Sequence, residues 1–157
     1  MKNFMIDMVK NEVLMSAICS WALAQIIKTI IYLFVNKKLL LERLIGSGGM
    51  PSCHSAAVCA LTTALIMKEG IGSNYVAIAG LLAVVVMYDA TGVRRETGNQ
   101  ARVLNEIIDM FKKRGSEISN DDKLKEFVGH TPLQVLVGAC LGVAFAIFYH
   151  GVIMKNF

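Results

Sequence analysis

The chain has 157 residues, of which 55% are apolar and 18% charged, and it carries a formal net charge of +4. A water-soluble protein of this size needs more polar surface, because a small domain exposes a large surface for its volume. The mean hydropathy of +0.54 and the gathering of charges between long uncharged runs exclude an ordinary soluble enzyme. They indicate one membrane-embedded domain over residues 1–157.

Four apolar runs follow one another along the chain, and we expect each to form a helix in the membrane. They cover Val13 to Val35, Ser55 to Met67, Tyr75 to Met87, and Leu133 to Met154. The second and third runs are short, since 13 residues of helix rise about 20 Å against a hydrocarbon core of about 30 Å. They must be extended at their ends, or else be re-entrant or tightly packed. The first run is too long for a cleavable signal peptide.

A polar stretch of about 94–130 separates the third run from the fourth. Apolar residues recur in it at helical spacing, namely Val103, Leu104, Ile107, Ile108 and Phe111. This pattern predicts an amphipathic helix on the membrane surface or against the bundle. The predicted fold class is therefore all-α: a membrane helical bundle of about four transmembrane helices plus one amphipathic cytoplasmic helix.

The distribution of Lys and Arg predicts the orientation. The loop after the first run and the 94–130 loop hold eleven of them, and the opposite side holds four, with Lys28 inside the membrane. The positive-inside rule then places the eleven in the cytoplasm and both termini outside. We expect a protein integral to the cell membrane, with no nucleic-acid partner.

The first chemically informative segment leads into the second run. It reads Gly46-Ser47-Gly48-Gly49-Met50-Pro51-Ser52-Cys53-His54-Ser55. Glycines let the backbone approach a ligand closely, and a helix start at Pro51 or Ser52 has free N–H groups that favour an anion. Ser52 adds a hydroxyl donor and His54 a titratable group. A capped helix start after a flexible loop is the simpler interpretation.

Two further segments carry similar chemistry. Tyr88-Asp89-Ala90-Thr91-Gly92-Val93-Arg94-Arg95 ends the third run, where the arginines either anchor the topology or clamp a phosphate. Asp89 at the membrane boundary requires a partner, either an arginine or a histidine. Gly129-His130-Thr131-Pro132 enters the fourth run with a helix-start signal at Thr131 and Pro132. The predicted topology places all three segments on the cytoplasmic face.

These segments, in this order, resemble a known family. Pro51-Ser52-Cys53-His54 resembles the Pro-Ser-Gly-His motif of the type 2 phosphatidic acid phosphatase superfamily, and His130 to Gln134 resembles its closing motif, a His followed four residues later by Asp. The ordered set is most similar to the superfamily's divergent branch, the membrane proteins related to acid phosphatase and vanadium-dependent haloperoxidase.

The resemblance implies a membrane-embedded, metal-independent phosphatase for a lipid phosphate monoester or pyrophosphate, without a cofactor. His130 is then the nucleophile that forms a phosphohistidine, and His54 is the general acid for the leaving alkoxide. Ser52 and Arg94 or Arg95 hold the phosphoryl oxygens. Lys28 corresponds to a phosphate-binding lysine of the superfamily, although a lysine whose amine snorkels to the membrane surface has the same signature.

The chain departs from the superfamily pattern at three positions. Cys53 stands where the motif has Gly, and Leu124 stands where an Arg is expected before the nucleophile. Gln134 stands where a carboxylate orients the nucleophilic His, and a Gln carbonyl accepts the imidazole N–H without stabilising its cation. Asp89 or Glu126 is the alternative orienting group.

Two other functions remain open from the sequence. One is a catalytically degenerate lipid-phosphate binder or scaffold, and the other is thiol chemistry at Cys53 beside His54. The spacing of Gly138 and Gly142 predicts close helix contact, either inside the bundle or across a homodimer. The four cysteines have no CxxC pairing and are interpreted as buried thiols rather than a metal site.

Overall fold

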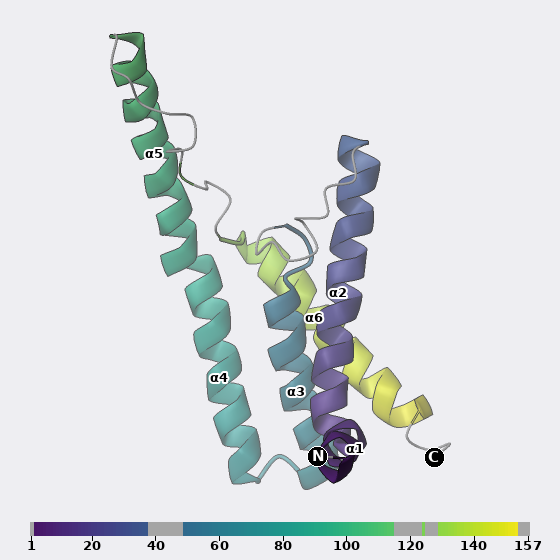
Figure 1. Cartoon of the computed structure of the whole chain (residues 1–157). Coiled ribbons are helices and arrows are strands. Elements are labelled where there is room, and N and C mark those ends of the chain that lie inside the picture. Colours follow the sequence, from purple (N-terminus) through teal and green to yellow (C-terminus); the bar gives the residue numbers. More distant parts are fainter. Residues whose placement is uncertain (1, 38–48, 115–123, 125–128, 154–157) are drawn as a thin grey trace.

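The computed structural model describes residues 2–37, 49–114, 124 and 129–153, and Figure 1 shows their arrangement. Every regular element within these ranges is helical. In chain order they are α1 (Lys2–Lys10), α2 (Glu12–Asn36), α3 (Cys53–Glu69), α4 (Asn74–Thr91), α5 (Val93–Lys113), α6 (Pro132–Phe148) and a π-helical turn, η3 (Tyr149–Ile153).

The predicted all-α fold and its four apolar helices are confirmed, and local capping explains where the helices begin. Asn11 caps α2, because its side-chain oxygen accepts the N–H of Leu14 at 3.1 Å. Ser52 caps α3 and Thr131 caps α6, with Pro132 in the first turn of α6. Each cap satisfies an N–H group that has no partner inside the helix. The end of the fourth predicted run, Met154, lies outside the described residues.

Small side chains at helical spacing form the interior of the bundle, with α3 packed against α2, α4 and α6. The buried residues recur every three or four positions: Ser16, Ser20 and Ala24 on α2; Cys53, Ala56, Ala60 and Ala64 on α3; Gly138, Gly142 and Ala146 on α6. Small residues let helix backbones approach closely, which is how helices associate where the surrounding lipid is as apolar as the side chains.

The two glycines of α6 lie against α3. A Cβ atom at Gly138 would collide with the carbonyl oxygen of Ser52, and one at Gly142 with that of Ala56. Of the two partners open from the sequence, the intramolecular one is therefore observed.

Three stretches among the described residues are long and apolar enough to cross a membrane: Glu12–Asn36, Asn74–Lys113 and Pro132–Val152. The sequence predicts about four. The remaining helix, α3, has 17 residues, which rise about 25 Å and fall short of a hydrocarbon core of about 30 Å. It packs against α2, α4 and α6, which agrees with the tightly packed alternative for this run.

The amphipathic helix differs from its predicted position on the membrane surface or against the bundle. Figure 1 shows that α5 continues the direction of α4 beyond the other helices. The cause is local: the N–H of Gly92 donates to Tyr88 O at 2.8 Å, and the carbonyl of Gly92 accepts from Glu96 N at 3.0 Å. Helical hydrogen bonding thus runs through the junction at Gly92 and joins the two helices. Most of the large apolar side chains of α5, including Val103, Leu104 and Phe111, are exposed.

The helices alternate in direction, so two ends of the bundle can be distinguished (Figure 1). We name the end where α3 and α6 begin and α4 ends the histidine end, because His54 and His130 lie there. α3 ends and α4 begins at the opposite end, together with α1 and η3.

Candidate active site

Two backbone hydrogen bonds join the three predicted segments at the histidine end. The N–H of Ser52, just before α3, donates to the carbonyl oxygen of Gln134 in the first turn of α6 at 3.1 Å. The N–H of His130, just before α6, donates to the carbonyl oxygen of Ala90 in the last turn of α4 at 3.0 Å. Segments that are far apart in sequence therefore lie side by side.

Ser52 has a structural role at this junction. Its side chain is fully buried, and its Oγ accepts the N–H of Ser55 at 3.4 Å and the Oγ–H of Ser55 at 3.0 Å. The sequence predicts Ser52 as a phosphate ligand, but its hydroxyl oxygen caps α3. Gly46, Ser47 and Gly48 of the same segment lie outside the described residues.

The predicted pairing of Asp89 is present in the structure. The Nε–H of Arg94 donates to Asp89 Oδ2, and the side chains of both residues are partly exposed. The ion pair spans the junction at Gly92 and orients the guanidinium toward the end of α4. In this structure Asp89 pairs with Arg94, and it makes no hydrogen bond to His130, the group it would orient as the alternative to Gln134.

Arg94 and Arg95 have different surroundings, although the sequence does not distinguish them. Arg94 lines the cavity described below, and Arg95 does not. The backbone of Arg95 instead packs against Gly129, where an added Cβ would lie 2.5 Å from the Cα of Arg95. Only glycine lets the chain pass this closely before it reaches His130.

Gln134 belongs to a capping box at the start of α6. Its Oε1 accepts the N–H of Thr131 at 3.0 Å, and its own N–H donates to Thr131 Oγ1 at 3.3 Å. This reciprocal pair satisfies two N–H groups that the helix leaves unpaired. The contact predicted between Gln134 and His130 is not made in this structure, where the acceptor oxygen is bound to the backbone. The alternative orienting group, Glu126, lies outside the described residues.

A cavity of about 230 Å³ lies between α3, α4 and the start of α6. It brings together four of the predicted site residues with part of one face of α4. Its lining consists of His54, Val85, Val86, Asp89, Ala90, Arg94 and His130. Among the described residues, no three His, Cys, Asp or Glu side chains are arranged to hold a metal ion.

His130 is the most distinctive group in this cavity. Its side chain is only 4% exposed, and neither Nδ1 nor Nε2 has a hydrogen-bond partner within the described part of the chain. A buried polar group left unpaired costs about 1–3 kcal/mol, so this imidazole is available to a group that enters the cavity. Burial, followed by the charges of His54, Lys28 and Arg94, lowers the pKa of His130 to about 4. Its imidazole is therefore neutral at physiological pH.

Lys28 of α2 is a further positively charged residue near His130. It is 4% exposed, and an added Cβ at Gly49 would lie 3.1 Å from its Cδ, so it packs under the chain that leads to Ser52. The alternative of a snorkelling lysine does not fit a side chain buried inside the bundle. Its charge contributes to lowering the pKa of His130, so the two groups lie within electrostatic range.

Comparisons with known proteins identify the family of the chain. Residues 9–145 match the sequence model described as the divergent PAP2 family. The chain belongs to the divergent PAP2 family. It is also 37% identical over 146 residues to the uncharacterized membrane protein YuiD of Bacillus subtilis (strain 168), a match that covers 87% of this chain and 92% of YuiD. No solved structure matches the chain.

Within this divergent PAP2 domain, three cavity residues were missed by the sequence interpretation: Val85, Val86 and Ala90 of α4. A helical projection could have identified them. Val85 precedes Asp89 by four residues and Val86 precedes Ala90 by four, so all of them lie on one face of the helix.

The thiol alternative has no support from this geometry. Cys53 is 1% exposed, does not line the cavity, and has its Sγ 3.7 Å from His54 Nδ1. Reactive cysteines occupy partly exposed positions, and this one is enclosed where α3 begins. At Cys53 the divergent PAP2 chain therefore has a core residue.

Proposed function

We propose that this divergent PAP2 protein is a metal-independent phosphatase that hydrolyses a lipid phosphate monoester or pyrophosphate through a phosphohistidine. One observation carries the proposal: the buried, unpartnered imidazole of His130 shares a cavity with His54 and Arg94. A neutral nucleophile, a second histidine and a cation are the groups that phosphoryl transfer without a metal requires.

The reaction follows from these positions. A ring nitrogen of His130 attacks phosphorus, the bond from phosphorus to the ester oxygen breaks, and His54 gives its proton to the departing oxygen. His54 then takes a proton from water as that water attacks the phosphohistidine, which releases phosphate and restores His130. Arg94 and Lys28 offset the negative charge on the phosphoryl oxygens. The bound phosphate in turn favours the protonated form of His54 that the first step needs.

Asp89 acts through Arg94 in this scheme. Because Nε of Arg94 donates to Asp89, the two terminal amino groups of the guanidinium can bind a phosphoryl group in the bidentate manner that suits its planar shape. Asp89 is therefore a positioning residue.

The shape of the cavity favours a lipid as the substrate. Its 230 Å³ is smaller than pockets that enclose whole drug-sized ligands, roughly 300–1,000 Å³, so it suits a phosphoryl group whose remainder lies outside. Val85, in its wall, is 55% exposed on a helix that is apolar enough to cross the membrane. A phosphorylated lipid can reach this wall without leaving the bilayer.

A lipid-phosphate binder without turnover is the second candidate. It is favoured by the side chain of Gln134, whose oxygen is bound to Thr131, and by the absence of any hydrogen-bond partner for His130 among the described residues. A superfamily site with a carboxylate in place of Gln134 stabilises the imidazolium of the nucleophile by charge.

Phosphate release by purified protein in detergent separates the two candidates. With EDTA present, we expect release of phosphate from a long-chain phosphatidate at least about tenfold faster than from glycerol phosphate. The reason is that binding of the acyl chains, away from the phosphate, helps to lower the barrier of the chemical step. Equal rates on both would contradict a lipid substrate. Saturable binding of phosphatidate without release would establish the binder.

We also propose that the histidine end faces the cytoplasm, since the loops there carry most of the Lys and Arg. Single cysteines at Arg95 and at Gly72 test this in a chain whose own four cysteines are replaced by serine. Both positions are exposed, they lie at opposite ends, and a side chain at Gly72 meets open space. In intact cells, a membrane-impermeant maleimide should label the Gly72 variant alone. Labelling of the Arg95 variant alone would reverse the orientation.

A further inference from the structure

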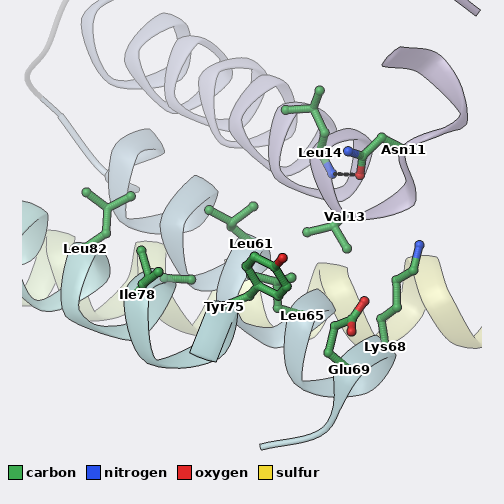
Figure 2. A pocket seen from close by; sticks show the side chains of 11 residues that line it. Asn11, Val13, Leu14, Leu61, Leu65, Lys68, Glu69, Tyr75, Ile78 and Leu82 are labelled. Carbon is green, nitrogen blue, oxygen red and sulfur yellow. Dashed lines mark hydrogen bonds between the residues drawn. The ribbon is translucent and has the colours of Figure 1, made fainter. Parts of the chain in front are cut away.

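A second, larger cavity lies at the opposite end of the bundle and takes no part in the proposed reaction. It measures about 490 Å³ and is formed where α2 begins, α3 ends and α4 begins. Figure 2 shows the side chains that line it: Asn11, Val13, Leu14, Leu61, Leu65, Lys68, Glu69, Tyr75, Ile78, Ala79 and Leu82.

The lining changes from polar to apolar with depth. On α3 it runs from Lys68 through Leu65 to Leu61, and on α4 from Tyr75 to Leu82. Seven residues of helix rise about 10 Å, so the apolar part extends roughly that far into the bundle. Figure 2 shows the same order, with Leu82 at one side and Lys68 and Glu69 at the other. The groove thus has a charged mouth and an apolar interior.

The position of the groove in the membrane determines what can fill the apolar part. α2 and α4, which form two of its walls, are both apolar enough to cross a bilayer. Tyr75, at the mouth, is 66% exposed, and tyrosine is enriched where membrane and water meet. An apolar groove that opens to the bilayer below this level is in contact with acyl chains rather than water.

The mouth holds one charge of each sign on adjacent residues. Lys68 and Glu69 are both exposed at the end of α3, and the side chains of both line the groove. A phosphate can accept hydrogen bonds from the ammonium of Lys68, and an ammonium can donate to the carboxylate of Glu69. A purely anionic head satisfies Lys68 but is repelled by Glu69.

We propose that this groove binds one phospholipid whose head carries a phosphate and a free ammonium, with one acyl chain along Leu65, Leu61 and Ile78. The phosphate is held by Lys68 and the ammonium by Glu69. This site is separate from the histidine end, so the proposal does not depend on whether His130 catalyses hydrolysis.

Thermal unfolding of the full chain in detergent, with added lipids of identical acyl chains, tests the proposal. Since a ligand that binds only the folded state raises the unfolding temperature, phosphatidylethanolamine should stabilise the protein more than phosphatidylglycerol or phosphatidylcholine. Phosphatidylcholine lacks the ammonium N–H groups, and phosphatidylglycerol lacks the ammonium altogether. Native mass spectrometry should show one retained phosphatidylethanolamine per chain.

Two kinds of variant locate the site. Ala79→Leu fills the groove and should abolish the retained lipid, and Ala77→Leu, an exposed neighbour on the same helix outside the lining, should not. Glu69→Gln and Lys68→Gln change exposed residues without disturbing the core, and each should weaken the preferred lipid roughly tenfold through loss of a charge-assisted hydrogen bond.

Three results would overturn the proposal. They are equal stabilisation by all three lipids, retained phosphatidylethanolamine in a folded Ala79→Leu protein, and unchanged affinity in both charge variants. His130→Ala should retain the lipid, since the two sites lie at opposite ends.

Discussion

Replacement of His130 by alanine should abolish release of phosphate from a lipid phosphate, lowering turnover by at least about 10³-fold, because the nucleophile is removed. The proposed mechanism assigns the attack on phosphorus to His130 and the acid role to His54, so His54 does not replace the lost nucleophile in it. When the wild-type enzyme reacts with a substrate whose phosphate is radiolabelled and is quenched rapidly without acid, the protein chain should carry the label. The His130→Ala variant should not be labelled.

His54 should show a different dependence on the substrate. His54→Ala should slow hydrolysis of an alkyl phosphate by about 10²–10⁴-fold, since an alkoxide needs a proton to depart. A nitrophenyl phosphate should lose far less, because nitrophenolate departs without one. This contrast assigns the acid role to His54, which a merely structural role would not reproduce.

The third histidine of the chain provides the control for both variants. His150 lies in η3, at the other end of the bundle, and does not line the histidine cavity. His150→Ala should therefore keep wild-type turnover on both substrates. If the His130→Ala protein remains folded and releases phosphate at the wild-type rate, the phosphohistidine mechanism is excluded.

Leucine at both Gly138 and Gly142 should prevent the chain from folding. At each position even a Cβ atom would collide with a backbone carbonyl of α3, and backbone cannot move aside as a flexible side chain can. Single alanine substitutions should each cost about 1–3 kcal/mol of stability, the usual range for overpacked sites. Size-exclusion chromatography and thermal unfolding in detergent measure the two effects.

Gly80 of α4 is a matched control, because an added Cβ there meets nothing within 4 Å. Gly80→Ala should be neutral or should stabilise the helix by about 0.5–1 kcal/mol, since alanine forms helix better than glycine. If the double leucine variant instead folds as a monomer with wild-type stability, the contact between α6 and α3 is wrong. A change in oligomer mass alone would indicate that these glycines form a dimer interface instead.

The same contact couples the packing of the bundle to the candidate site. Gly138 lies against the carbonyl of Ser52, and the N–H of Ser52 is bound to Gln134, so the start of α3 is held on the first turn of α6. Milder variants that fold, such as Gly138→Ala, should therefore also lower turnover.

Much of the fold was determined by the local sequence. Four apolar runs set the helices, and Asn11, Ser52 and Thr131 with Pro132 mark where three of them begin, because capping and helical periodicity act over a few neighbouring residues. The need of Asp89 for a positive partner was local as well, since a carboxylate at the membrane boundary is costly alone.

Tertiary packing determined the surroundings of residues whose roles the local sequence left open. It placed Arg94 rather than Arg95 at the cavity, buried Lys28, and left His130 without a partner. These outcomes depend on how four helices meet, which no short stretch of sequence specifies. Gln134 shows the limit most clearly: its spacing from His130 predicted an orienting group, but the N–H of Thr131 lies closer along the chain and takes its oxygen. A backbone donor that must be satisfied at a helix start competes directly with a side chain across the site.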